Sequence, residues 1–200
     1  MLTRRSTLAL PALMLPGLLL PGQAHAQGVQ GATAFVTSFG ETLTAIINGP
    51  GSYEEKKRRL APVIEQDVDV DGIARFCLGR FIRQATPAQQ QEYSQLFHRV
   101  LLTNIFGKLG EFRGVTFQMT TTTQTEEGST VGTLIQRPGQ KANTVQWVVA
   151  ASTGRPKIID VKAEGTSLRL TQRNDYTSYL TRNGDDVGAL LTAMRGQLAG

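Results

Sequence analysis

The spacing of apolar residues changes twice along this chain, and the two changes set its class of fold. Between Val29 and Leu109, apolar residues recur every three or four positions, which is the period of amphipathic helices. From Val115 the period falls to two, as in strands with one buried face. After Gly165 the helical spacing returns. A helical part, a block of strands and a helical tail predict a single α+β domain.

Four helices are expected to begin at capping residues. Two of them open with a capping box, in which Ser or Thr is followed three residues later by Glu or Gln. The predicted caps are Ser52, Asp71, Thr86 and Asp185. The run 48–51, Asn-Gly-Pro-Gly, is expected to end the first helix.

Four strands are expected after Val115, because turn residues interrupt the block three times. The turns lie at 126–129, 138–139 and 153–156, and each contains glycine. Successive strands joined by short turns form an antiparallel meander. We expect the helices to cover one face of this sheet and the other face to be partly solvated.

The N-terminus, residues 1–26, has the pattern of a secretory signal peptide. Two arginines precede an apolar run over 8–20, and an Ala-His-Ala cleavage site follows. A membrane anchor is the alternative, but prolines interrupt the run and a span needs roughly 20 apolar residues. We expect cleavage before Gln27, one domain over 27–200, and a location outside the cytoplasm. Export would use the Sec route or, given the Arg4-Arg5 pair, the twin-arginine route.

The charge and the cysteine content of the chain limit which classes of partner it can have and whether it can form a disulfide. Removal of Arg4 and Arg5 lowers the net charge from +5 to +3, and the run 56–59, Lys-Lys-Arg-Arg, is the one dense basic block. On a helix this block is a solvated face, or else a contact for anionic head groups or an acidic partner. No nucleic-acid partner is predicted. Cys77 is the single cysteine, so no internal disulfide can form, and its apolar neighbours predict a buried, inert thiol.

Three patterns that carry chemistry in other proteins are incomplete here. The run 67–72 opens like a calcium loop, but Leu78 stands where a bidentate glutamate is required. His98 is the one histidine after residue 26, and no Gly-x-Ser-x-Gly motif supplies a nucleophile for it. We therefore predict no enzyme activity, no metal and no cofactor. A pair of carboxylates acting as acid and base is the residual enzymatic alternative.

Two motifs resemble those of a known family. The strings 73–81, Ile-Ala-Arg-Phe-Cys-Leu-Gly-Arg-Phe, and 85–93, Ala-Thr-Pro-Ala-Gln-Gln-Gln-Glu-Tyr, resemble the helical core of the MlaC, or toluene-tolerance, family. The segment 159–168 is similar to the family's Asp-Val-x-x-Glu-Gly-x-Ser sequence. The likeness covers nearly all of the chain after the signal sequence. Departures at 155–158 leave the subfamily open, including a relative associated with hopanoid lipids.

The resemblance implies a soluble periplasmic carrier of phospholipid. Such a carrier moves lipid between an outer-membrane lipoprotein complex and an inner-membrane ABC transporter complex, and so maintains the lipid asymmetry of the outer membrane. Its fold would be α+β, a four-stranded antiparallel sheet covered on one face by several helices that enclose an apolar lipid cavity. The phospholipid would be cargo rather than a cofactor, the partners would bind transiently, and a monomer is expected. An envelope assembly or interaction protein with a filled core is the alternative.

The inward stripes of helices and strands predict the wall that contacts the acyl chains. The choice of strand face stays open, because a shift of one residue in register inverts it. The predicted wall consists of Phe76, Phe81, Phe97, Leu101, Phe106, Phe117, Leu134, Trp147, Val149 and Val161. Arg75, Arg80 and Arg83 are expected to be solvated helix faces, or alternatively to lie near a mouth or a docking surface.

Overall fold

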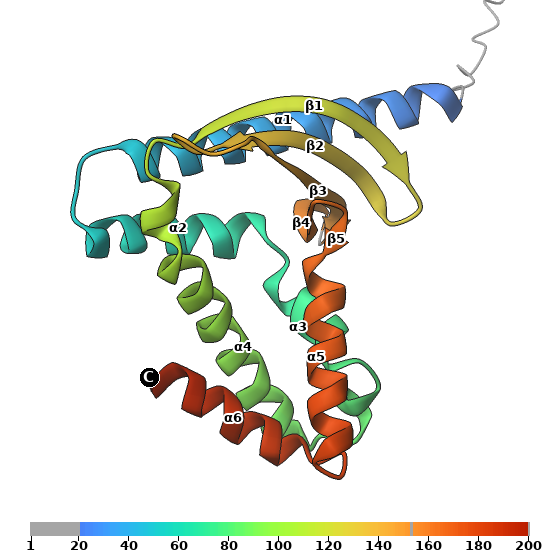
Figure 1. Ribbon diagram of the computed structural model, residues 1–200. Helices are drawn as coiled ribbons and strands as arrows, with labels where there is room; N and C mark the ends of the chain where they lie inside the picture. Colours follow the sequence, from blue (N-terminus) through green and yellow to red (C-terminus); the bar gives the residue numbers. More distant parts are fainter. Residues whose placement is uncertain (1–20, 153, 200) are drawn as a thin grey trace, which may run out of the picture.

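The computed structural model describes residues 21–152 and 154–199, and the side chains of 28–151 and 154–199 (Figure 1). Most of the predicted signal sequence therefore lies outside the described residues, and cleavage before Gln27 stays a prediction. The elements, in chain order, are α1 (Pro21–Asn48), α2 (Tyr53–Asp67), α3 (Val70–Leu78), η1 (Gly79–Arg83), α4 (Pro87–Gly107), η2 (Leu109–Phe112), β1 (Thr116–Thr125), β2 (Gly128–Gln136), β3 (Asn143–Ser152), β4 (Arg155–Ala163), β5 (Thr166–Ser167), α5 (Leu168–Arg182) and α6 (Val187–Ala199).

The sheet is the predicted antiparallel meander with one short strand added. Its order is β1-β2-β3-β4-β5, and every neighbouring pair is antiparallel. The added strand β5 forms because Glu164 and Gly165 both take positive φ, 50° and 83°, and turn the chain back on β4 within two residues. The four predicted strands are confirmed, and the fifth is a minor difference.

Both predicted capping boxes are confirmed. The Ser52 hydroxyl accepts a hydrogen bond from the backbone N–H of Glu55, and the Glu55 carboxylate accepts one from the N–H of Ser52. Thr86 and Gln89 exchange the same pair of bonds at the start of α4. These bonds satisfy backbone N–H groups that have no partner inside the helix.

The other two predicted caps are wrong by one or two positions. Asp69, not Asp71, caps α3, because its carboxylate accepts from the N–H of Gly72 at 3.0 Å. Asp186, not Asp185, accepts from the N–H of Gly188 at 2.8 Å and so caps α6. In both places several acids stand close together in the sequence, and only the backbone geometry selects which of them reaches the free N–H group.

The helices divide into two groups around the sheet (Figure 1). Helix α1 runs along β1 and β2, and α2 packs beside it, whereas α3 packs on α5 and α4 on α6, on the side away from α1. No helix in the described part of the chain is long and apolar enough to cross a membrane.

The buried apolar residues form three clusters, which we name by position. The sheet cluster joins α1, α2 and the strands, with the buried residues Ala32, Val36, Phe39, Ile64, Val131, Trp147, Val149 and Ile158. The helical cluster joins α3 to α6 and centres on Phe81, Tyr93, Phe97, Tyr176, Leu180 and Leu191. The corner cluster, Ile46, Leu60, Phe106 and Leu109, fills the junction of α1, α2 and α4.

Candidate functional site

The register of the sheet settles which strand residues face the helices. Phe117 pairs with Ile135, Val131 with Trp147, and Trp147 with Val161, and paired residues lie on one face of the sheet. All five of these side chains belong to or pack against the sheet cluster. The side of Trp147 is therefore the one that faces α1 and α2.

The ten residues of the predicted wall fall into different places. Phe117, Trp147, Val149 and Val161 lie in the sheet cluster. Phe76, Phe81, Phe97 and Leu101 belong to the helical cluster, and Phe106 to the corner cluster. Leu134 pairs with Gln118 and Thr144 on the opposite face, so the expectation that it points toward the helices is wrong. One register step separates it from the helix-facing Ile135.

The sheet cluster is incompletely covered by protein. It has 8 buried apolar residues and 11 that are only partly buried, whereas the helical cluster has 16 buried and 7 partly buried. The partly buried residues of the sheet cluster include Leu102 and Ile105 of α4, Phe117 and Met119 of β1, and Val145 and Val161 of β3 and β4. An apolar layer between a sheet and its helices is thus left partly open.

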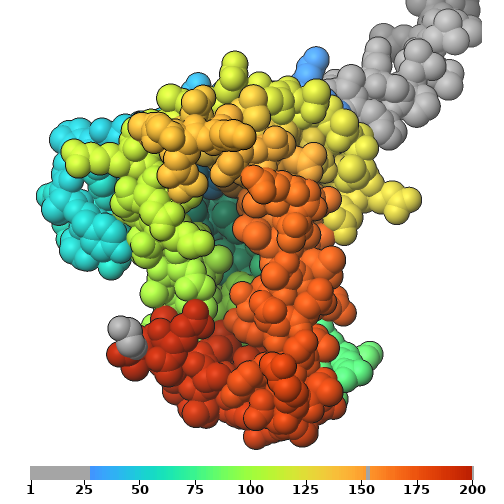
Figure 2. Space-filling model, viewed as in Figure 1, coloured from blue at the N-terminus to red at the C-terminus, as the bar shows by residue number. Residues whose placement is uncertain are grey.

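Two hollows reach the surface beside this layer. Figure 2 shows the face of the molecule hollowed below β3 and β4, between α4 and α5, with atoms of α2 and α3 at the back. A groove of about 460 Å³ lies between α1 and α2 beside the start of β4, and Phe35, Phe39, Pro62, Val63 and Pro156 are among its lining residues. Phe39 is buried and contacts Trp147, so this groove ends on the sheet cluster.

Trp147 sits at the centre of the layer with its polar group already satisfied. Its indole N–H donates to the Thr133 hydroxyl at 3.0 Å, and that hydroxyl donates to the carbonyl of Val145 at 3.0 Å. The rings of Phe39 and Phe117 pack near it, with centroids 5.6 and 6.3 Å away. What the tryptophan presents to its surroundings is therefore an apolar surface that needs no hydrogen-bonding partner.

Phe117 is held against the backbone of α1. A Cβ atom at Gly40 would overlap its ring, so the absence of a side chain at this position lets the helix approach β1. Two threonines fix the same helix to the same strand, since the hydroxyls of Thr33 and Thr122 are 2.8 Å apart. These contacts position Phe117 in the layer beneath α1.

The Asp-Val-x-x-Glu-Gly-x-Ser segment builds a buried joint around Asp160. Its carboxylate is 2% exposed and accepts from the Ser167 hydroxyl at 2.6 Å and from the backbone N–H groups of Val161 and Arg169 at 2.8 and 3.2 Å. The tight turn at 164–165 brings Ser167 back to Asp160. The motif therefore ties β4 to the first turn of α5.

Arg169 extends this joint to two more elements. Its guanidinium lies 3.6 Å from Asp160, 2.7 Å from Glu127 in the β1–β2 turn, and 4.5 Å from the ring centre of Phe76 on α3. Arg173 approaches the same ring at 4.8 Å. Phe76 is thus a packing partner of two arginines. The sequence motif signalled Asp160 and Ser167, but neither Arg169 nor Glu127 stood out in the sequence.

Ser94, Asp71 and His98 lie close together but are not ordered as a catalytic triad. Ser94 donates to the Asp71 carboxylate at 2.8 Å, and the His98 Nε2 lies 3.0 Å from the same oxygen, so the aspartate separates the hydroxyl from the imidazole. These two bonds lower the pKa of Asp71. Serine catalysis requires the reverse order, with the histidine between serine and acid. No group of three or more potential metal ligands occurs in the described ranges.

Cys77 is a buried thiol, as the sequence predicts. It is 1% exposed, and burial raises its pKa to about 12. Burial also raises the pKa of Tyr93, whose hydroxyl donates to the carbonyl of Ala74 at 3.0 Å. Both groups are neutral at physiological pH and serve as packing residues of the helical cluster.

Comparison with known proteins identifies the family. The sequence profile of the MlaC protein family matches residues 37–196, which is most of the chain. The chain belongs to the MlaC family. This confirms the resemblance carried by the helical strings and by the segment 159–168. The Asp160 joint and the sheet cluster, except Ala32, Phe35 and Val36, lie inside the matched region.

Two relatives of this MlaC-family chain are informative. It is 26% identical over 150 residues to the toluene tolerance protein ttg2D of Pseudomonas putida, covering 74% of this chain and 67% of the relative. Its fold matches a solved structure from Ralstonia solanacearum, described as a phospholipid-binding protein in complex with a phospholipid. That match has a TM-score of 0.74 at 23% identity and covers 84% of this chain and 97% of the other. The shared fold confirms the predicted α+β class.

Proposed function

We propose that this protein binds a phospholipid in the apolar layer between its sheet and its helices and carries it through the periplasm. The observation that carries the proposal is the incomplete cover of the sheet cluster, where 11 apolar residues stay partly exposed beside 8 buried ones. Acyl chains would supply the contacts that the protein itself does not make. Membership of the MlaC family and the phospholipid in the Ralstonia protein support the same cargo.

The proposed wall follows the sheet cluster rather than the wider set expected from the sequence. It keeps Phe117, Trp147, Val149 and Val161, and it adds Leu102 and Ile105 of α4 with Met119, Ile135 and Val145 of the strands. Phe81 and Phe97 leave it because they fill the closed helical cluster, and Leu134 leaves it because it faces the other way.

The apolar character of this wall fits a carrier better than a tight receptor. Exposing acyl chains to water costs about 0.8 kcal/mol per methylene, so free lipid rarely crosses an aqueous gap. A carrier must match the apolarity of the bilayer without exceeding it by much, because a lipid held far more tightly than in the membrane would not be released. The Trp147 indole N–H already donates to the Thr133 hydroxyl, so the centre of the layer offers an apolar surface.

The route would run between an outer-membrane lipoprotein complex and an inner-membrane ABC transporter complex, with transient docking at each. Export would depend on residues 1–26 and leave a mature domain over 27–200. Catalysis is not part of this function. Maintenance of outer-membrane lipid asymmetry is the physiological consequence that we propose.

Native mass spectrometry tests the cargo directly. The protein is expressed with its N-terminal segment, purified without detergent, and measured before and after solvent extraction. An added mass equal to one or more phospholipids, lost on extraction and identified as lipid, would support the proposal. A bare mass of residues 27–200 that stays unchanged after incubation with liposomes would instead favour an envelope assembly protein with a filled core.

A further inference from the structure

One end of the molecule, at the junction of α1 and α2, carries the excess positive charge. We define this basic end as residues 48–59 and 106–115 together with Arg137. Three hydrogen bonds hold its segments together: the Asn48 side chain donates to the carbonyl of Val115 at 3.0 Å and accepts from the N–H of Gly114 at 2.8 Å, and the Tyr53 hydroxyl donates to the carbonyl of Phe106 at 3.1 Å. In Figure 1 it lies around the cyan loop between α1 and α2.

The net positive charge of the basic end exceeds that of the whole predicted mature chain. Its seven basic residues are Lys56, Lys57, Arg58, Arg59, Lys108, Arg113 and Arg137, and its three acidic residues are Glu54, Glu55 and Glu111. The resulting net charge of +4 compares with +3 for residues 27–200, so the rest of that chain is slightly acidic. A molecule with this asymmetry turns its basic end toward an anionic surface.

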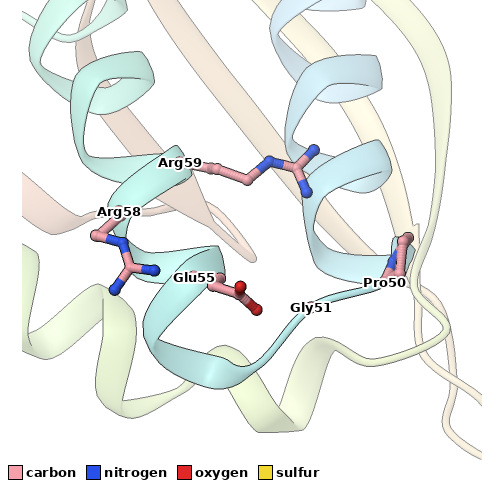
Figure 3. A pocket seen from close by; sticks show the side chains of 5 residues that line it. All are labelled: Pro50, Gly51, Glu55, Arg58 and Arg59. Atoms are coloured by element: carbon pink, nitrogen blue, oxygen red, sulfur yellow. The ribbon is translucent and has the colours of Figure 1, made fainter.

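The arginines of this end are available for such a contact. Arg58 and Arg59 are exposed, and neither forms an ion pair within 4.0 Å among the described residues. Glu55 lines the same pocket as both arginines, and its carboxylate accepts from the N–H of Ser52 at 2.6 Å in the capping box. Figure 3 shows Arg58, Arg59 and Glu55 around a pocket of about 490 Å³, with Arg59 reaching from α2 toward α1.

The remaining surface of this end fits a bilayer better than a protein partner. Tyr53, 47% exposed, is its one exposed large apolar side chain among the described residues, because the others, Leu168 and Leu170, lie on α5. A protein interface is usually anchored by a cluster of buried aromatic or aliphatic residues, which this end lacks. A single tyrosine surrounded by lysines and arginines is typical of the boundary between lipid head groups and water.

We propose that the basic end docks on phospholipid bilayers that contain anionic lipid, with Arg58 and Arg59 contacting lipid phosphates. This docking is separate from cargo binding, because neither arginine belongs to the sheet cluster. Docking would present the carrier to a membrane in one orientation. Each basic residue near an anionic surface strengthens binding about fivefold at moderate ionic strength.

Vesicle sedimentation tests the proposal with the complete domain. The mature protein is mixed with vesicles of phosphatidylcholine alone, or with about 30% phosphatidylglycerol, at about 0.1 M and about 0.5 M salt. The test variant is Arg58→Glu/Arg59→Glu. The matched control is Arg83→Glu/Arg182→Glu, which changes the net charge equally at exposed arginines outside the basic end. Lipid content after purification is measured for each protein.

The expected result is binding to the acidic vesicles only, weakened by high salt, reduced about 25-fold or more in the test variant and by much less in the control. Unchanged lipid content in the test variant would show that docking and cargo binding are separate. Equal losses in the two variants would overturn the proposal, because binding would then follow net charge alone. No binding of the wild type to acidic vesicles would also overturn it and would favour an acidic protein as the partner of this end.

Discussion

The helical cluster and the sheet cluster are built from the same kinds of residue, yet the helical cluster is closed and the sheet cluster is partly open. In the helical cluster, Tyr93, Phe97 and Tyr176 pack with ring centres about 6 Å apart, and Tyr93 also bonds to the backbone. In the sheet cluster, Phe117 and Val161 remain half-buried around Trp147. Composition therefore does not distinguish a core from a binding cavity, whereas completeness of burial does.

The two clusters have different roles in the domain. The closed helical cluster stabilises the domain without any ligand, which lets the sheet cluster stay partly open. The Asp160 joint connects the two regions, as do Val68, which packs on both clusters, and α4, which has Leu101 in the helical cluster and Leu102 in the sheet cluster. Substitutions in the helical cluster should therefore lower the stability of the domain, and substitutions in the sheet cluster should lower the amount of bound lipid.

The largest expected effect comes from emptying each cluster in turn. Phe97→Ala should lower the free energy of unfolding by about 3–5 kcal/mol, because it leaves a cavity in a closed core. Phe117→Ala should lower that of the lipid-free protein by less, about 1–2 kcal/mol, since its side chain is only partly buried. Urea denaturation of delipidated proteins measures both values. Equal losses would mean that the sheet cluster is an ordinary core.

A charge placed in the sheet cluster should abolish lipid loading while the domain still folds. Phe117→Asp would bring a carboxylate against acyl chains, and we expect at least about tenfold less co-purifying lipid. Gln118→Asp is the matched control, because Gln118 is the next residue of β1 and lies exposed on the opposite face. Leu134→Asp should also spare loading. Normal loading in Phe117→Asp with an intact circular dichroism spectrum would show that the wall is elsewhere.

The joint between the two regions should be sensitive to the loss of one charge. Asp160→Asn removes the ion pair with Arg169 and weakens three hydrogen bonds, which should cost about 1–3 kcal/mol of stability. Asp175→Asn, an exposed aspartate of α5, should change stability by less than about 0.5 kcal/mol. Thermal unfolding of the two variants side by side distinguishes a joint from a general charge effect.

The smallest expected effect is on the stability of the protein at acidic pH, and it involves only residues of the helical part. Hydrogen bonds from Ser94 and His98 lower the pKa of Asp71, so its contribution to stability is complete above about pH 4 and is lost as the pH falls through the lowered pKa. Because Asp71 is largely exposed, the contribution should stay below about 1 kcal/mol. Asp71→Asn should flatten the stability profile below pH 4 by that amount. If the variant lost as much stability below pH 4 as the wild type does, this assignment would be contradicted.

The elements of the fold could be predicted from the sequence, because their signals are local. The capping boxes at Ser52 and Thr86, the break at 48–51 and the change to alternating spacing at Val115 each act within a few residues. Caps with several neighbouring acids, such as Asp69 and Asp71, were not resolved by the same logic. Their choice depends on backbone geometry that the sequence pattern does not contain.

The site was predicted only in part, because its residues are brought together by register and tertiary packing. Trp147 and Phe117 share a face owing to strand pairing, and Leu134 does not, although all three are apolar residues in strands. Phe81 and Phe97 lie on inward helix faces, but these faces meet other helices rather than the sheet. Periodicity shows that a side chain points into the protein, but it does not show which of the apolar clusters that side chain joins.

Trp147 provides the most direct test of the lipid site, because it is the one tryptophan of the chain and lies at the centre of the sheet cluster. Delipidated protein is incubated with vesicles of phospholipid brominated on its acyl chains, separated from them, and compared with protein loaded with the unbrominated lipid. If acyl chains occupy the layer beside Trp147, its fluorescence will be strongly quenched by the brominated lipid only. Equal fluorescence with both lipids, at equal lipid content, would contradict the account.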